Sequence, residues 1–366
     1  MASSWIRHPS LWLSVFLVLS LLGNLALILP TYIVVVDPAP EEPLSVPHQK
    51  IQYSHPLVDD TYLEMLSLNT SENAIVTILR SDALAVPIAT LGHSLDKVNS
   101  TVRRIALYVP GRVSPRALCI AALTGFEPKA ISPTITPAPA VALDADAHPT
   151  QQHFRQAAGL EPKFWDFEEL GLKAVVYLDA STLARRNFDE LFTLPFAFAA
   201  VPDARINNSR SDMDLDGRLL FFRPSAVAFQ TLLARANITV YARDQEQAIT
   251  HAFYGPDALR LPQAYSGDLE LKRRSRSLWE GLQAELRLIH YSLVQPFWRG
   301  THDDVGLEGT HEIVRLRASD WDGAFREEVL EWGGAWRETE ETHRLEIMKC
   351  SWKHGMKPPN VFLTSD

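Results

Sequence analysis

The sequence predicts an α/β domain that follows an N-terminal transmembrane helix. Apolar runs of strand length alternate with segments whose apolar residues recur at helical spacing, which is the order of elements in α/β folds. The strand-length runs are apolar almost throughout, as expected of strands covered on both faces. No charged residue occurs between His8 and Asp37, which predicts the transmembrane helix. The 366 residues suffice for one large domain or two smaller ones.

The uncharged segment at residues 11–36 is long enough to cross a bilayer as a helix. It exceeds the apolar core of about 7–15 residues in a cleaved signal peptide, which remains an alternative together with a buried helix. Arg7 precedes the segment and acidic residues follow it, so the positive-inside rule places residues 1–10 in the cytosol. We therefore predict a single-pass type II protein of the Golgi or ER membrane, with its remaining residues in the lumen.

Sequons and cysteines bear on the same prediction. Cys119 and Cys350 are the only cysteines; they allow one disulfide in an oxidising lumen, and the sequence leaves open whether they meet. N-x-S/T triplets, which accept N-glycans in secreted chains, begin at Asn69, Asn99, Asn207 and Asn237.

Four elements open the predicted domain after a proline-rich stem at residues 37–72. The apolar runs NAIVTIL and RRIALYV predict strands, and each is followed by a segment with apolar residues at helical spacing. Ser114, directly before Pro115, suits the N-cap of the second helix. In chain order the elements are strand 73–79, helix 84–98, strand 103–109 and helix 114–126.

A proline- and alanine-rich loop at residues 132–150 separates these elements from a second group. LKAVVYL is apolar almost throughout and predicts a strand, and AFAAV and RLLFF predict two more. A C-terminal helical extension is predicted at residues 301–366. The elements are strands 172–178, 197–201 and 218–222, then helices 225–236, 325–348 and 350–359.

Charge and motifs exclude several classes of ligand. The net charge is −9, and nucleic-acid binding depends on clustered Lys and Arg, so we expect no nucleic-acid partner. The sequence contains neither G-x-G-x-x-G nor G-x-x-x-x-G-K-[ST], so dinucleotide and P-loop sites lack their phosphate cradle. Ligands of α/β sheets bind outside the carboxyl ends of the strands, and Asp179 follows the strand at 172–178.

Four segments in a fixed order carry the most specific pattern. They are VTILRSDALAVPIATLGHSL, KFWDFEELGLKAVVYLDAST, DGRLLFFRPS with DQEQAITHAF, and HYSLVQPFW. In this order they resemble glycosyltransferase family 8, specifically its glycogenin-like branch, in which LDADT…NIDELF corresponds to LDAST…NFDELF here. The resemblance spans roughly residues 73–298. It implies a GT-A type fold, Rossmann-like with a mixed sheet and flanking helices, over residues 73–300. It also implies transfer of a sugar from a nucleotide sugar, usually a UDP-sugar, with retention and with a divalent cation, often Mn²⁺.

The resemblance assigns a metal site to Asp179, Ser181 and His290. Asp179 matches the first carboxylate of the family's D-x-D and Ala180 its middle residue, so both also count as nucleotide-sugar-binding. Ser181 stands where the family has the second carboxylate, and a neutral hydroxyl is a weaker ligand for a hard cation. The alternative for Asp179 is a turn residue that bonds its own backbone.

Further residues match family positions that contact the donor. Thr77 matches a position beside the uridine, and Lys163 matches a lysine near the diphosphate, although an exposed lysine is an equal alternative. Asp216, Gly217 and Arg218 correspond incompletely to the family's N-[ST]-G. The family's Tyr, Gly and Lys are replaced by Leu84, Leu293 and Gln295.

Asp244 and Gln245 match the family's D-Q pair beside the transferred sugar and are the predicted catalytic residues. A carboxylate or amide there can stabilise oxocarbenium-like charge, whereas the alternative is an Asp at a helix N-terminus. An intact D-x-D, Asp144 and Asp146 with His148, lies in the proline-rich segment 132–150, and we interpret it as a loop rather than a metal site.

The sequence therefore predicts a membrane-anchored lumenal glycosyltransferase that moves a hexose from a nucleotide sugar to a glycan or glycoconjugate. The substitutions at Ser181, Leu84 and Gln295 leave two alternatives open. One is a catalytically degenerate relative that acts as a glycan-binding or scaffolding protein. The other is a metal-independent transferase in which basic side chains replace the cation.

Overall fold

The computed structural model describes residues 56–58, 60–66, 68, 71–131, 167, 170–203, 215–228, 258–298, 307 and 309–353. The chain divides into two compact units, residues 1–45 and 46–366, and all described residues lie in the second. The predicted cytosolic tail, membrane anchor and most of the stem therefore lie outside the described residues. No helix in the described part of the chain is both long enough and apolar enough to cross a bilayer.

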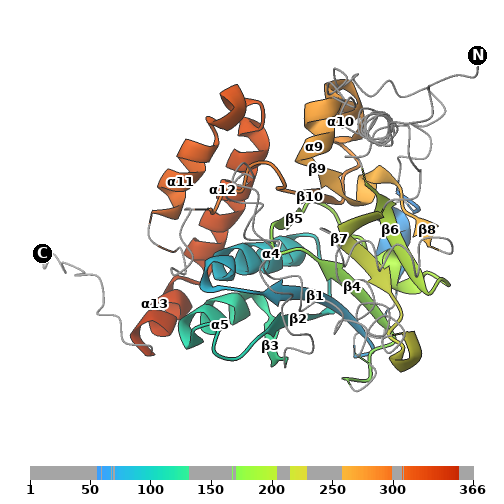
Figure 1. Cartoon of the computed structure of the whole chain (residues 1–366), viewed down its shortest axis with the longest axis horizontal. Helices are drawn as coiled ribbons and strands as arrows, with labels where there is room; N and C mark the ends of the chain where they lie inside the picture. Colours follow the sequence, from blue (N-terminus) through green and yellow to red (C-terminus); the bar gives the residue numbers. More distant parts are fainter. Residues whose placement is uncertain are drawn as a thin grey trace, which may run out of the picture. The chain divides into compact units, whose positions relative to one another are not determined.

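The centre of the fold is a seven-stranded mixed sheet in the order β3-β2-β1-β4-β7-β6-β8 (Figure 1). Strands β1 to β4 are mutually parallel, β7 is antiparallel to both β4 and β6, and β8 is parallel to β6. The predicted mixed α/β sheet with flanking helices is confirmed. The strands are β1 Asn73–Leu79, β2 Arg103–Tyr108, β3 Phe126–Ala130, β4 Ala174–Leu178, β6 Phe198–Pro202, β7 Leu215–Phe222 and β8 Leu259–Arg260.

The five predicted strands correspond to β1, β2, β4, β6 and β7, while β3 and β8 were not predicted. Every residue of β1 and β4 is buried, which explains their continuous apolar sequence. β3 lies at the sheet edge with only its first residue buried, and it contains Pro128, which edge strands tolerate. β8 has two residues and therefore no pattern to detect.

The first two predicted helices are confirmed as α4 (Ala85–Lys97) and α5 (Pro115–Ala121). They pack against each other beside β1 and β3 (Figure 1). Ser114 caps α5 as predicted: its hydroxyl accepts a 3.2 Å hydrogen bond from the amide of Ala117. Short 3-10 turns, η2 (Asp82–Leu84) and η3 (Ala122–Thr124), flank these helices.

The C-terminal helices pack on this layer. They are α11 (Thr310–Arg317), α12 (Arg326–Thr342) and α13 (Arg344–Lys353), with the 3-10 turn η8 (Asp320–Gly323) before α12. α12 packs on α4 and fully buries Trp332 and Trp336, and α13 packs on α5. The break between α12 and α13 lies at His343, whose backbone is not helical, rather than after residue 348 as predicted. The domain boundary at residue 300 remains a prediction.

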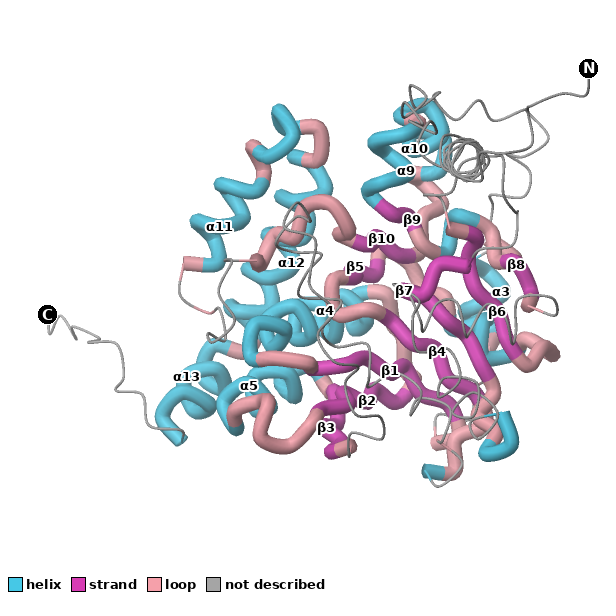
Figure 2. The backbone as a smooth tube through the Cα atoms, viewed as in Figure 1, coloured by secondary structure: helices cyan, strands magenta, loops and turns pink. Residues whose placement is uncertain are grey.

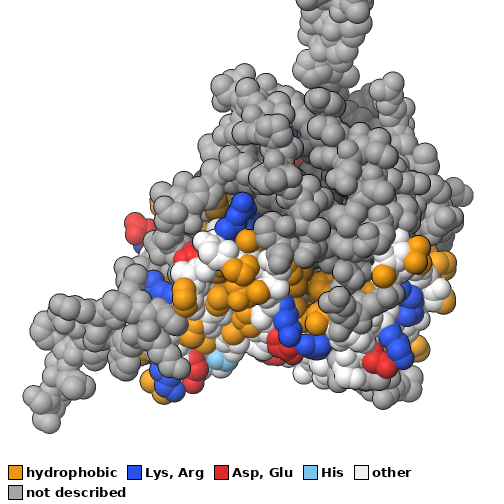
Figure 3. All heavy atoms as spheres, turned by 60° about the horizontal axis from the view of Figure 1, so that its bottom comes forward, with side chains coloured by type: hydrophobic (Ala, Val, Ile, Leu, Met, Phe, Trp, Pro, Cys, Tyr) orange, Lys and Arg blue, Asp and Glu red, His pale blue; other side chains and the backbone are white. Residues whose placement is uncertain are grey.

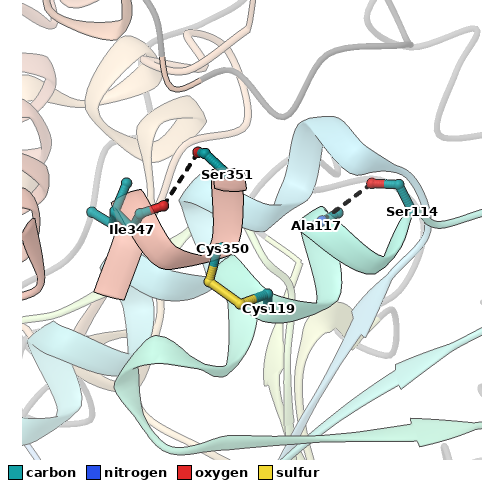
Figure 4. The surroundings of a disulfide bond; sticks show 6 residues. All are labelled: Ser114, Ala117, Cys119, Ile347, Cys350 and Ser351. Atoms are coloured by element: carbon teal, nitrogen blue, oxygen red, sulfur yellow. Dashed lines mark hydrogen bonds between the residues drawn. A yellow bond between two sulfur atoms is a disulfide. The ribbon is translucent and has the colours of Figure 1, made fainter. Parts of the chain in front are cut away.

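Cys119 of α5 and Cys350 of α13 form a disulfide, with their Cα atoms 5.6 Å apart. Figure 4 shows this bond between the two helices, together with the Ser114 cap and the hydrogen bond from Ser351 to the carbonyl oxygen of Ile347. The question that the sequence left open is thus answered by the packing of α13 on α5.

A second, three-stranded sheet has the order β5-β10-β9 (Figure 2). β10 is antiparallel to β5 and parallel to β9, and His290 is its last residue. Its members are β5 Thr182–Ala184, β9 Gly267–Asp268 and β10 Leu288–His290. The neighbouring helices and turns are α9 Leu269–Arg274, α10 Arg276–Leu282, η6 Asp189–Thr193 and η7 Gln263–Tyr265.

Part of the predicted stem is tied to the domain. The amide of Leu57 donates a 2.9 Å hydrogen bond to the hydroxyl of Tyr265, and the guanidinium of Arg287 donates one of 2.9 Å to the carbonyl oxygen of Val58. Residues Asp60–Met65 form the helix α3 within the stem. The domain end of the stem is therefore ordered against the domain.

The described surface mixes charged and hydrophobic side chains (Figure 3). On the face in Figure 3, the coloured Lys, Arg, Asp and Glu side chains are scattered among hydrophobic atoms and do not gather in a block of one sign. The exclusion of a nucleic-acid partner remains a prediction from the charge of the sequence.

Candidate functional site

β4 delivers Asp179 to the carboxyl edge of the main sheet, as the sequence predicts. The strand is buried throughout, and the amide of Asp179 continues the pairing with β7 by a 3.0 Å hydrogen bond to the carbonyl oxygen of Arg218. The side chain of Asp179 is 16% exposed. The carboxylate is therefore held on a rigid strand end and is still reachable from solvent.

The three predicted metal-binding side chains come together. The Ser181 amide donates a 2.8 Å hydrogen bond to Asp179 Oδ1, and the Ser181 hydroxyl donates to the same oxygen. His290 Nε2 lies 2.9 Å from Ser181 Oγ and 3.3 Å from Asp179 Oδ1. Pairing of β10 with β5 brings these segments together, because the Tyr291 amide donates to the Ser181 carbonyl oxygen (3.0 Å).

The electrostatics of this cluster favour an ionised Asp179. Burial by itself would raise the pKa of its carboxyl, but hydrogen bonding and charge from His290, the charge of Arg80 and the bond from Ser181 outweigh burial. The pKa of Asp179 therefore lies well below its usual range. Asp179 is the permanent negative charge of the cluster.

This donor set does not fit a divalent cation. It offers one carboxylate, one neutral hydroxyl and one imidazole, and the charge of the carboxylate is offset by nearby Arg80. Asp179 Oδ1 also already accepts two hydrogen bonds from Ser181. In the part of the chain that the structure describes, no group of three or more His, Cys, Asp or Glu side chains could hold a metal ion.

A second polar cluster adjoins the first. The Arg218 guanidinium bonds Asp216 Oδ1 through Nε (2.5 Å) and forms an ion pair with Asp268 through Nη1. Asp268 lies opposite His290 in the pairing of β9 with β10, and it accepts a hydrogen bond from the Ser292 hydroxyl. Sequence reasoning noted Arg218 only as a mismatch and missed Asp268, because a two-residue strand carries no motif.

The other residues of the predicted donor site that the structure describes differ in burial and in hydrogen bonding. Thr77 is fully buried on β1, and its hydroxyl has no hydrogen-bond partner among the described residues. Ala180 is buried between Asp179 and Ser181, whereas Gly217 is exposed, and a Cβ there would meet no atom within 4 Å. Leu84 is buried, as is Gln295, whose Oε1 also lacks a partner in the described part of the chain.

Several predicted residues lie outside the described residues. These are the catalytic pair Asp244 and Gln245, the donor-site Lys163, the second D-x-D with Asp144, Asp146 and His148, and the sequons at Asn69, Asn207 and Asn237. Their predicted roles remain predictions.

A surface cavity of about 470 Å³ lies elsewhere, between α11 and α12. Its polar lining includes His311 and Glu340, which pair with each other at 2.8 Å. No residue of the two polar clusters lines it. The chemistry-bearing side chains therefore gather at the sheet edge and not in this cavity.

The stability contributions of two carboxylates, the buried Asp189 and the partly exposed Asp179, should respond to pH in opposite directions. Burial raises the pKa of Asp189 despite a 2.7 Å hydrogen bond from Ser100, whereas the pKa of Asp179 is lowered. The stabilising contribution of Asp189 is therefore present below its unfolded pKa of about 3.9 and is lost as pH rises through the folded value. That of Asp179 is present above about pH 3.9 and is lost as pH falls through the folded value.

Urea denaturation across the acid range checks this contrast. As pH rises, the free energy of unfolding of the wild type should fall relative to Asp189→Asn and rise relative to Asp179→Asn. Each variant serves as the control for the other. Slopes of the same sign for both variants would contradict the assignment.

Sequence comparison relates this chain to the glycosyltransferases, so the resemblance predicted from its four segments is confirmed at that level. The inositol phosphorylceramide glucuronosyltransferase 1 of Arabidopsis thaliana is 24% identical over 246 residues, covering 61% of this chain. The chain spans 42% of the length of that relative. No model of a known protein family matches the chain.

Solved glycosyltransferase structures are similar to the chain only at low scores. The bifunctional glycosyltransferase WbbM, in its apo form, has a TM-score of 0.44 at 12% identity, covering 73% of this chain and 52% of WbbM. The galactosyltransferase LgtC with donor and acceptor sugar analogues scores 0.44 at 14% identity, covering 69% and 99%. Apo GlyE of Streptococcus pneumoniae scores 0.41 at 16% identity, covering 79% and 66%. Scores below 0.5 do not establish a shared fold.

Proposed function

We propose that the protein is a GT-A type glycosyltransferase that moves a hexose from a UDP-sugar to a glycan or glycoconjugate with retention. The observation that carries the proposal is the convergence of Asp179, Ser181 and His290 at the carboxyl edge of the sheet. These residues come from two segments far apart in the sequence. Ligands of α/β sheets bind at this edge, and the relative is a sugar-transferring enzyme.

In this proposal each polar residue has a place along the donor. Thr77 lies beside the uridine, and Asp179 accepts hydrogen bonds from the ribose end of the nucleotide. Lys163 offsets the charge of the departing diphosphate, and Asp244 with Gln245 steadies the positive charge that develops on the sugar. Asp216 acts indirectly, because its carboxylate holds the Arg218 guanidinium. The predicted Mn²⁺ is not needed for any of these roles.

The relative's name also supports the choice of acceptor. The relative is named for the transfer of a glucuronosyl group to inositol phosphorylceramide, which is a membrane lipid. A type II anchor at residues 11–36 would hold the domain close to such acceptors. We therefore propose a membrane-bound glycoconjugate as the acceptor and the Golgi or ER as the location. The alternative is that the protein has lost catalytic activity and binds glycans. The hydroxyl of Ser181 in place of the second D-x-D carboxylate favours this alternative.

Replacing Asp179 by Asn tests the transferase proposal. We expect the release of UDP from UDP-hexose to fall at least about 100-fold, as on loss of one preorganised electrostatic contact in other active sites. Glu280→Gln removes one negative charge from the exposed face of α10 and should leave the rate unchanged. A wild-type protein that binds UDP without turning over any UDP-hexose would support the alternative.

Glycosylation of Asn99 tests the lumenal orientation. Asn99 is exposed just after α4 in a left-handed conformation (φ 57°), Ser100 is buried and Thr101 is exposed. The disulfide also fits an oxidising compartment. We expect Asn99→Gln to remove one glycan-dependent shift in gel mobility, while Thr101→Ser retains the triplet and the shift. If N-glycosidase does not change the gel mobility of the chain, and both cysteines are reduced in cells, the domain lies in the cytosol.

A further inference from the structure

We propose that Arg287 is a positioning residue of the candidate site, which holds β10 and its last residue His290 in place while residues 57 and 58 of the stem are docked on the domain. The inference rests on the proposed transferase function, because it concerns the same site. It predicts that this part of the stem is needed for activity, beyond any role in connecting the domain to the membrane anchor.

A short antiparallel pair of strands, β5 and β10, connects Arg287 with the candidate site. At the end that carries the site, the Tyr291 amide donates a hydrogen bond to the Ser181 carbonyl oxygen (3.0 Å). At the other end, the carbonyl oxygen of Arg287 accepts hydrogen bonds from the amides of Arg185 (2.8 Å) and Arg186 (3.2 Å). Each strand has three residues, so the two ends are only about 10 Å apart, and a displacement at one end reaches the other.

The side chain of Arg287 binds the stem. It is 2% exposed, and its Nη2 donates a 2.9 Å hydrogen bond to the Val58 carbonyl oxygen and lies 3.9 Å from Glu190 Oε1. The Tyr265 hydroxyl donates to the same carboxylate oxygen of Glu190 (2.7 Å) and accepts a hydrogen bond from the Leu57 amide (2.9 Å). Arg287, Glu190 and Tyr265 therefore form a buried cluster that binds the main chain of the stem.

Docking of the stem supplies hydrogen-bond partners to this cluster. Without it, the Arg287 guanidinium would lose an acceptor and the Tyr265 hydroxyl would lose a donor, although both side chains are buried. Leaving a buried polar group without its partner costs more free energy than the hydrogen bond contributes when it is formed. We expect the Arg287 side chain to turn toward water in that state, which displaces residue 287 and, through β10, the imidazole of His290. The docked stem therefore favours the arrangement in which His290 Nε2 lies 2.9 Å from Ser181 Oγ.

Leu57→Pro in the full-length chain, purified in detergent, tests the inference without changing the domain. Proline has no N–H, so the variant loses the hydrogen bond to Tyr265, and the replaced Leu57 side chain is 45% exposed. We expect kcat for the release of UDP from UDP-hexose to fall at least about tenfold, because misplaced groups slow the chemical step, while KM changes less than about threefold. Leu57→Ala keeps the amide and is the matched control, so both constants should equal those of the wild type.

Nuclear magnetic resonance of ¹³C-labelled histidine side chains gives a readout that does not depend on activity. The signal of His290, identified by its absence in His290→Gln, should shift in Leu57→Pro and stay in place in Leu57→Ala. Arg287→Met/Glu190→Gln removes both charges of the buried pair, so that no unpaired charge is left. The same shift is expected in this double variant, and adding Leu57→Pro should cause no further shift, because the connection is already broken.

The outcomes separate the inference from the proposed function. A wild type that releases no UDP from any UDP-hexose overturns the transferase proposal, and the His290 signal then still decides whether Arg287 positions His290. An unchanged His290 signal with an unchanged kcat in Leu57→Pro overturns the inference. So does an effect of Leu57→Pro that persists in full in the Arg287→Met/Glu190→Gln background, because Arg287 would then not be the connection. A lower urea midpoint with an unchanged His290 signal shows a role in stability alone and also overturns the inference.

Discussion

Removing the Cys119–Cys350 disulfide is expected to lower the free energy of unfolding by about 5 kcal/mol. The two cysteines are 231 residues apart in sequence, so the bond closes a very long loop of the unfolded chain. In the chain-entropy account a cross-link stabilises by restricting the unfolded state, and loops of this length give about 5 kcal/mol at 25 °C. Urea denaturation of the Cys119→Ala/Cys350→Ala variant against the oxidised wild type measures the loss.

The single-cysteine variants separate the effect of the cross-link from the effect of local packing. Either Cys119→Ala or Cys350→Ala already opens the bond, so each should lose nearly as much as the double variant. Reduction of the wild type with dithiothreitol should give the same loss without changing any side chain volume. If the two single losses were small and added up to that of the double variant, local packing of α13 on α5 would be the source of stability instead of the cross-link.

The sequence predicts the elements whose patterns report burial. NAIVTIL and AVVYL become strands with every residue buried, and Ser114 before Pro115 becomes an N-cap. β3 escapes prediction because an exposed edge strand needs no apolar run, and its Pro128 argues against a strand. The disulfide escapes because it depends on which helix α13 packs against, and no local pattern encodes that choice.

The sequence likewise predicts some residues of the candidate site and misses others. Asp179 and His290 were found because each lies in a segment that resembles a family motif. Asp179 follows β4 and His290 ends β10, and the fold brings their side chains within 3.3 Å. Asp268 was not found, because its role depends on a side chain from β7 reaching it across the fold. Arg218 was visible only as a departure from a family pattern. Its ion pairs with Asp216 and Asp268 depend on the fold and are visible only in the structure.

Replacing Lys272 by Met is expected to cost about 3–5 kcal/mol of folding free energy. Glu328 of α12 is fully buried, and its carboxylate receives hydrogen bonds from Lys272 (2.7 and 2.8 Å) and from the indole of Trp279 (3.1 Å). Removing the ammonium leaves a buried carboxylate without its counter-charge, which is far more costly than the pair is stabilising. Urea denaturation at neutral pH measures the loss.

A double variant separates the unpaired charge from lost packing. Lys272→Met/Glu328→Gln carries no buried charge, so it should recover most of the stability that Lys272→Met loses. Lys97→Met breaks the exposed pair between Lys97 and Glu338 and should cost at most about 1 kcal/mol. A double variant as unstable as Lys272→Met would mean that the aliphatic stem of Lys272 matters more than its charge. Recovery would instead show that the buried charge of Glu328 on α12 is tolerated only when Lys272 of α9 pairs with it, so this ion pair couples the two helices.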